Sequence, residues 1–185
     1  MRIISGKHKG RRLIAPKKLP VRPTTDMAKE ALFNIVGNLY DLEEVSVLDL
    51  FSGTGNIAYE FASRGTLQLT AVDQNVHCIR FIQQNSKALS LDIKTIKADV
   101  FKFLTQIRTS HDLIFADPPY DLSQADFQKI IDLVFEYNLL KEGGILVIEH
   151  SKHMVLSENQ NFESSRTYGS STFSFFEQAS AITPN

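Results

Sequence analysis

The chain has 185 residues, 43% of them hydrophobic and 22% charged, which fits one globular domain and excludes a disordered chain. The single cysteine, Cys78, excludes an internal disulfide, and no apolar run of about 18 residues could span a membrane, so we expect a cytoplasmic protein. The formal net charge is only −1, but residues 1–22 hold eight Lys or Arg and no acid, so the rest of the chain is formally −9.

The first predicted element is a basic arm, residues 1–23, that forms a β-hairpin. Two short apolar runs, "RIIS" and "RRLIAP", flank "GKHKG", whose two glycines suit a turn, and "KKLPVRP" then indicates an extended linker. A basic arm on an acidic body is typical of proteins that bind nucleic acid, because phosphates attract concentrated positive charge. The alternative is an arm that docks on the acidic surface of its own domain.

Residues 24–185 are predicted to form the main domain, which begins with a helix over residues 24–39 that Thr24 or Thr25 can cap. Strands and helices then alternate, which predicts an α/β fold with a mostly parallel sheet covered on both faces. The strands are expected at 45–51, 67–73, 93–99, 111–117 and 143–150, and the helices at 55–65, 76–91, 100–108 and 123–140. Residues 162–178 are predicted to form an antiparallel pair of strands.

A glycine-containing loop follows the first predicted parallel strand and leads into a helix. The run "LDLFSGTGNIA" places Gly53 and Gly55 there, with Ala58 where the dinucleotide-binding fingerprint has its third glycine. Glycines at this position let the backbone approach a ligand at a helix N-terminus. By itself the loop leaves NAD, FAD and S-adenosylmethionine open as ligands.

Three acids lie near the carboxyl ends of successive predicted strands. Asp73 comes 20 residues after Gly53, where a carboxylate can bind the two hydroxyls of a ribose. Asp49 and Asp99 lie near the ends of the strands before and after it. Each acid could simply cap a helix. Together they favour a ligand site, because open α/β sheets bind ligands at this edge.

The run "LIFADPPYD", residues 113–121, ends the fourth predicted parallel strand with an acid, two prolines and an aromatic residue. Because proline fixes φ and lacks a backbone N–H, this turn leaves the Asp117 carboxylate and the Pro118 carbonyl as rigid acceptors beside Tyr120. Such a site suits a planar base with an exocyclic amine, since Tyr120 can stack on the base and the acceptors can take both N–H bonds. A plain strand-ending turn is the alternative.

Residues 49–55 (D-x-F-x-G-x-G) and 117–120 (D-P-P-Y) resemble motifs I and IV of S-adenosylmethionine-dependent amino methyltransferases. Residues 2–13, 21–34 and 48–65 are similar to the RsmD family, which methylates N2 of a guanine in bacterial small-subunit (16S) rRNA. The resemblance implies a Rossmann-like class I fold with seven strands, the last of them antiparallel, preceded by an N-terminal hairpin and helix. It runs from Arg2 to about Glu149.

The same resemblance implies a role for individual residues. The S-adenosylmethionine site would comprise Asp49, Phe51, Gly53, Gly55, Asp73, Asp99 and Val100. The catalytic site around the guanine would comprise Asp117, Pro118 and Tyr120. The residues expected to contact RNA are Arg2, Lys9, Arg11, Arg12, Arg22, Thr24 and Pro119. The expected partner is 16S rRNA or a small-subunit assembly intermediate, bound by a monomer that carries no metal.

The chain departs from the family at Met27-Ala28-Lys29, where arginines are common, so some of their phosphate contacts are expected either to be lost or to be replaced by Lys29. Two other functions remain open from the sequence. A DNA adenine-N6 methyltransferase would also use D-P-P-Y, although no target-recognition domain is evident. A non-catalytic RNA-binding assembly factor would keep the fold, but the intact glycines and Asp117 argue against it.

Overall fold

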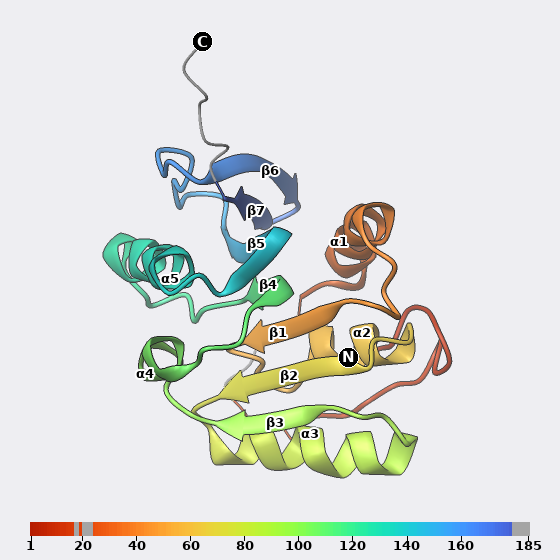
Figure 1. The fold of residues 1–185 in the computed structure, drawn as a ribbon. Coiled ribbons are helices and arrows are strands. Elements are labelled where there is room, and N and C mark those ends of the chain that lie inside the picture. Colours follow the sequence, from red (N-terminus) through yellow and green to blue (C-terminus); the bar gives the residue numbers. More distant parts are fainter. Residues whose placement is uncertain (17–18, 20–23, 179–185) are drawn as a thin grey trace.

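The computed structural model describes residues 1–16, 19 and 24–178. Its centre is a seven-stranded sheet with the strand order β3-β2-β1-β4-β5-β7-β6 (Figure 1). The strands are β1 (Ser46–Leu50), β2 (Gln68–Asp73), β3 (Lys94–Lys97), β4 (His111–Ala116), β5 (Leu140–Ser151), β6 (Phe162–Tyr168) and β7 (Ser171–Glu177). The first five strands pair in parallel, and β7 runs antiparallel to both β5 and β6. The predicted fold class is thereby confirmed.

In the part of the chain that the structure describes, five helices cover the two faces of the sheet (Figure 1). They are α1 (Asp26–Leu39), α2 (Asn56–Ser63), α3 (Val76–Leu89), α4 (Val100–Gln106) and α5 (Gln124–Glu136). Successive residues of β1 point to opposite faces: Val47 packs with α1, α2 and α3, whereas Leu48 packs with α4 and α5. All of β1 is buried, as expected for a strand covered on both faces, although Ser46 and Asp49 are polar.

The helix boundaries follow local capping. Thr25 caps α1, because its hydroxyl accepts a hydrogen bond from the Ala28 N–H at 3.2 Å. Ser123 and Asp126 form a reciprocal capping box at the start of α5. By contrast, α2 begins after Gly55, which has a φ of 82° and gives no side-chain cap. The first turn of α2 therefore has no side-chain cap for its backbone N–H groups, and the N–H of Ala58 donates to Asp49 on β1.

The N-terminal arm folds back on itself and packs against α2. An antiparallel bridge joins Arg2 to Arg12, and Ile3 and Leu13 are buried in the core that α1, α2 and α3 share. Gly6, at a φ of 78°, passes so close to α2 that a Cβ would lie 1.8 Å from the Ser63 carbonyl oxygen. The hairpin is thus docked on its own domain. The domain boundary at residue 23 stays a prediction, and Arg22 lies outside the described residues.

Candidate functional site

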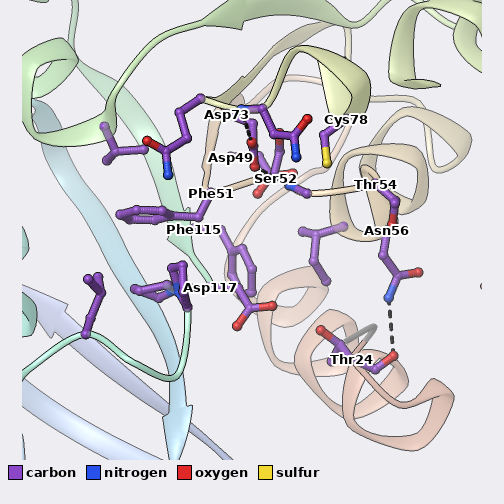
Figure 2. Close-up of a pocket in the computed structure, with 18 of the residues that line it drawn as sticks. Thr24, Asp49, Phe51, Ser52, Thr54, Asn56, Asp73, Cys78, Phe115 and Asp117 are labelled. Atoms are coloured by element: carbon purple, nitrogen blue, oxygen red, sulfur yellow. Dashed lines mark hydrogen bonds between the residues drawn. The ribbon is translucent and has the colours of Figure 1, made fainter. Parts of the chain in front are cut away.

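A cavity of about 650 Å³ opens at the carboxyl edge of the sheet, where β1, β2 and β4 end (Figure 2). Nearly all residues predicted for the cofactor and target sites line it: Asp49, Phe51, Gly53, Asp73, Asp99, Val100, Asp117, Pro118 and Tyr120. Thr24 and Pro119, predicted to contact RNA, line it as well. Among the described residues, no Lys, Arg or His lines this cavity. Its charge is therefore suited to a cationic ligand.

The loop after β1 contains three residues with unusual backbone conformations. Phe51, Gly53 and Gly55 all have positive φ, at 55°, 52° and 82°. A positive φ is costly for phenylalanine, and such strain is found mainly where a ligand site requires it. No pattern in the sequence indicated this conformation at Phe51. The Gly53 N–H donates to Asp73 Oδ2 at 2.8 Å, which fixes the loop against the end of β2.

Gly55 serves packing rather than the cavity wall. A Cβ at this position would lie 2.8 Å from Cγ1 of Ile82 on α3, and Gly55 does not line the cavity. A side chain there would separate α2 from α3. The predicted contact of Gly55 with the cofactor stays a prediction, whereas Gly53 lies at the cavity itself.

Asp49 is a buried carboxyl group with incomplete hydrogen bonding. Its side chain is 2% exposed, the Ala58 N–H donates to it, and its Oδ2 has no partner among the described residues. Burial, reinforced by the negative charge of Asp73, raises the pKa of this carboxyl well above its usual value. An unsatisfied acceptor in the wall of a cavity is well placed to receive a donor from a ligand.

Asp73 and Asp99 combine ligand-facing positions with local structural roles. Asp73 accepts from the backbone N–H of Gly53 and, at 2.7 Å, from that of Asn75. Asp99 caps α4 by accepting from the Lys102 N–H at 3.0 Å, so the helix-capping interpretation is correct for one of its oxygens. Both residues still line the cavity.

Asp117 directly follows β4 and lies in a cluster of acidic side chains. Burial, then Glu149, then Asp49 raise the pKa of the Asp117 carboxyl well above its usual value. Glu149 lies on the neighbouring strand β5 and is only 3% exposed. Pro118 is buried, while Tyr120 is exposed at the mouth of the cavity. Sequence reasoning did not single out Glu149, which follows the apolar run of β5.

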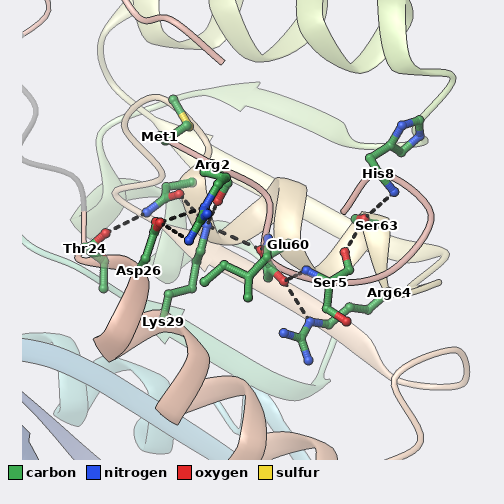
Figure 3. Close-up of polar contacts among 12 residues, drawn as sticks. Met1, Arg2, Ser5, His8, Thr24, Asp26, Lys29, Glu60, Ser63 and Arg64 are labelled. Atoms are coloured by element: carbon green, nitrogen blue, oxygen red, sulfur yellow. Dashed lines mark hydrogen bonds and ion pairs between the residues drawn. The ribbon is translucent and has the colours of Figure 1, made fainter. Parts of the chain in front are cut away.

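Thr24 and Lys29 are both buried, and Figure 3 shows them among polar contacts inside the protein. Thr24 is 7% exposed and donates its hydroxyl hydrogen to Glu149 Oε2 at 2.7 Å. Lys29 is fully buried, where its Nζ lies 3.3 Å from Glu60 and donates to the Arg2 carbonyl at 2.6 Å. The expectation that Lys29 replaces surface arginines is wrong, because its ammonium group pairs with Glu60 inside the protein.

The remaining residues predicted to contact RNA lie on the arm. Lys9, Arg11 and Arg12 are exposed, and Arg2 is half-exposed with its guanidinium 2.9 Å from Asp26. The structure does not bring these residues into the cavity. They form a separate basic surface on the docked hairpin.

Two further features bear on function. In residues 1–16, 19 and 24–178, no group of three or more His, Cys, Asp or Glu is placed to hold a metal ion. Within the same ranges, no helix is long and apolar enough to cross a membrane.

Comparison with known proteins places the chain among methyltransferases. A family model described as conserved hypothetical protein 95 matches residues 1–177. A Bacillus subtilis protein named "Putative rRNA methyltransferase YlbH" is 36% identical, over 85% of this chain and 86% of its own. The ribosomal RNA small subunit methyltransferase D of a Buchnera aphidicola strain is 32% identical, over 80% and 75%. The solved structure of a hypothetical protein from Thermus thermophilus, TTHA0928, has a TM-score of 0.84 and 25% identity, and covers 96% of this chain and 99% of its own.

Proposed function

The chain belongs to the family described as conserved hypothetical protein 95, an RsmD-type family of methyltransferases, and we propose that it transfers a methyl group from S-adenosylmethionine to N2 of a guanine in small-subunit rRNA. One observation carries the proposal. The Asp117-Pro118-Pro119-Tyr120 turn lines the same cavity as the Gly53 loop. A target amine bound at the turn and a methyl donor bound at the Gly53 loop would therefore share one site.

The cavity suits S-adenosylmethionine in its charge and in the residues that line it. This cofactor carries a sulfonium and an ammonium group, and the cavity offers the unpartnered Asp49 oxygen and no basic side chain among the described residues. The loop from Phe51 to Gly53 would hold the methionine part, and Asp73 the ribose hydroxyls. Asp99 and Val100 would hold the adenine. When bound, the cofactor supplies an already activated methyl group, so the protein needs mainly to position the acceptor.

Asp117 would position the guanine amine. An aromatic amine is a weak nucleophile because its lone pair is delocalised into the ring. Acceptors at Asp117 and the Pro118 carbonyl would take the two N–H bonds, favour a pyramidal nitrogen and stabilise the positive charge that develops on it. Tyr120 would stack on the base, which must leave its helix or be unpaired to enter the cavity.

The exposed cations of the arm would bind the RNA backbone. Lys9, Arg11 and Arg12 project from the docked hairpin, and contacts of this kind give affinity without reading sequence. We further propose that the enzyme works in the cytoplasm as a monomer on 16S rRNA or a small-subunit assembly intermediate. Because Gly6 packs against α2, the arm would meet RNA as a preformed surface.

The product of the reaction tests the proposal. Small-subunit rRNA from a strain that lacks the protein should be incubated with the purified enzyme and labelled S-adenosylmethionine, then digested to nucleosides. We expect N2-methylguanosine at one position, identified by mass spectrometry of nuclease fragments. Methylation of adenine-N6 in DNA, or binding of rRNA with no methyl transfer, would overturn the proposal in favour of one of the other two functions.

A further inference from the structure

Thr24 lies in the wall of the target end of the cavity and is held there from two sides (Figure 2). Its hydroxyl donates to Glu149 at 2.7 Å. Its backbone carbonyl accepts from Asn56 Nδ2 at 3.2 Å, and Lys29 Nζ donates to the other end of that amide, Asn56 Oδ1, at 2.8 Å. The position of the Thr24 oxygen is therefore fixed by interactions with β5, α2 and α1.

The bond to Glu149 decides what Thr24 can offer a ligand. A threonine hydroxyl has one hydrogen to donate and two lone pairs that accept. Because the buried carboxylate of Glu149 takes the hydrogen, only lone pairs remain for a group in the cavity. In this arrangement Thr24 Oγ1 is an acceptor and not a donor.

Asp117 lies next to the same glutamate. Ala116 on β4 pairs with Ile148 on β5. Asp117 and Glu149 directly follow these two residues and are therefore neighbours, and the charge of Glu149 helps to raise the pKa of Asp117. Thr24 and Asp117 therefore flank Glu149 and face one cavity, although they lie on segments far apart in the sequence. The target end of the cavity thus presents two neighbouring acceptors.

From this pairing we infer that Thr24, oriented by Glu149, reads the N1 position of the target base and so selects guanine over adenine. Guanine carries hydrogen-bond donors at both N1 and N2, which match acceptors at Thr24 and Asp117. Adenine carries an amine beside an N1 that only accepts, and its N1 would face the lone pairs of Thr24. The inference rests on the proposed function and adds the group that distinguishes the base.

The test uses RNA substrates that carry either guanine or 2-aminopurine at the mapped position. 2-Aminopurine keeps the exocyclic amine but has no hydrogen on N1. Wild-type enzyme should methylate guanine about 10- to 100-fold faster in single turnovers, the range expected for a specific base contact. Thr24→Val should lose most of this preference, because its rate on guanine falls by much more than its rate on 2-aminopurine. Thr24→Ser should retain the preference.

Glu149→Gln gives a second, independent readout. A glutamine amide can donate to Thr24 Oγ1, which frees the hydroxyl hydrogen to point at an N1 that accepts. The preference should then shift toward 2-aminopurine. Equal losses on both bases in Thr24→Val, with an unchanged ratio, would overturn the inference and leave Thr24 a structural role. Absence of N2-methylguanosine with wild-type enzyme would instead contradict the proposed function.

Discussion

Glu60 on α2 and Asp49 on β1 are both buried acids, yet their surroundings differ in charge. Glu60 is fully buried and accepts from the backbone N–H groups of Ile4 and Ser5 at 2.8 and 2.9 Å. The guanidinium of Arg64 lies 2.9 Å away and the Lys29 ammonium 3.3 Å away. Asp49 has an oxygen without a partner among the described residues, and its charged neighbour is another acid, Asp73.

This difference in surroundings distinguishes a buried acid that stabilises the fold from one that is suited to bind a ligand. A carboxylate whose hydrogen bonds and charge are satisfied holds the fold together, here by tying the arm to α2. Carboxylates that repel one another in a cavity wall destabilise the free protein and become favourable only when a ligand brings donors or positive charge. Substitutions in the two places should therefore have opposite effects on stability.

The largest effect on stability is expected at the satisfied site. Glu60→Gln would leave the Lys29 ammonium buried without its counter-ion, and breaking a buried pair in this way costs about 3–5 kcal/mol. Urea denaturation should show a lower midpoint with an unchanged slope. Glu30→Gln, the same chemical change at an exposed position of α1, should alter stability by about 0.5 kcal/mol or less. If the Glu60 variant is as stable as the Glu30 control, Glu60 does not stabilise the fold.

Asp49→Asn should act in the opposite direction. It removes a carboxyl group whose charged form is disfavoured by burial, so the free energy of unfolding at neutral pH should stay the same or rise. S-adenosylmethionine affinity should fall about tenfold or more, since a hydrogen bond to a charged group is worth about 1.5–3 kcal/mol. Calorimetry with the purified variant measures the affinity. Loss of stability with intact affinity would assign Asp49 to the fold instead.

Charge reversal on the arm should weaken RNA binding and leave the cofactor site intact. Replacing Arg11 and Arg12 by Glu should remove about two phosphate contacts. The slope of log RNA affinity against log salt concentration should become shallower by the corresponding amount. S-adenosylmethionine affinity should be unchanged because neither residue lines the cavity. The same double reversal at Arg80 and Lys87, exposed on α3, is the control. If RNA affinity changes neither with salt concentration nor with the arm substitutions, the arm is excluded as the docking surface.

The smallest expected change is a shift in the pH profile. Protonation of Asp117 removes its negative charge and one of its two acceptor oxygens, and its pKa is raised, so methyl transfer should fall as pH drops through that raised pKa. Glu149→Gln removes a like charge beside Asp117, which lowers the pKa of Asp117 and should move the acid limb of the single-turnover rate to lower pH. A limb that does not move would show that Asp117 and Glu149 are uncoupled.

The sequence predicted the parts of the site that depend on local order along the chain. Strand-helix alternation located the carboxyl edge of the sheet, and the acids at strand ends, with the D-P-P-Y turn, were therefore expected to meet there. All of them line one cavity. Gly55 was the exception, because its packing against Ile82 depends on how two helices approach each other.

The tertiary polar contacts could not be predicted in the same way. Thr24 and Glu149 are 125 residues apart, and no periodicity indicates that one donates to the other. Lys29 was expected at the surface, since lysine is rarely buried without a partner. Its spacing from Leu32, Phe33 and Val36 places it on the buried face of α1, a signal that outweighs residue type here.

Single-turnover methylation by Asp117→Ala tests the central claim most directly. Removing a preorganised electrostatic partner costs about 2.7–4 kcal/mol in the transition state, so the rate on the mapped guanine should fall about 100-fold or more. Asp117→Asn, which keeps one acceptor oxygen, should be less impaired; both variants should keep wild-type S-adenosylmethionine affinity, and Asp117→Asn should be at least as stable as wild type. Wild-type rates in Asp117→Ala would contradict the account, because the D-P-P-Y turn would then end a strand without holding the target amine.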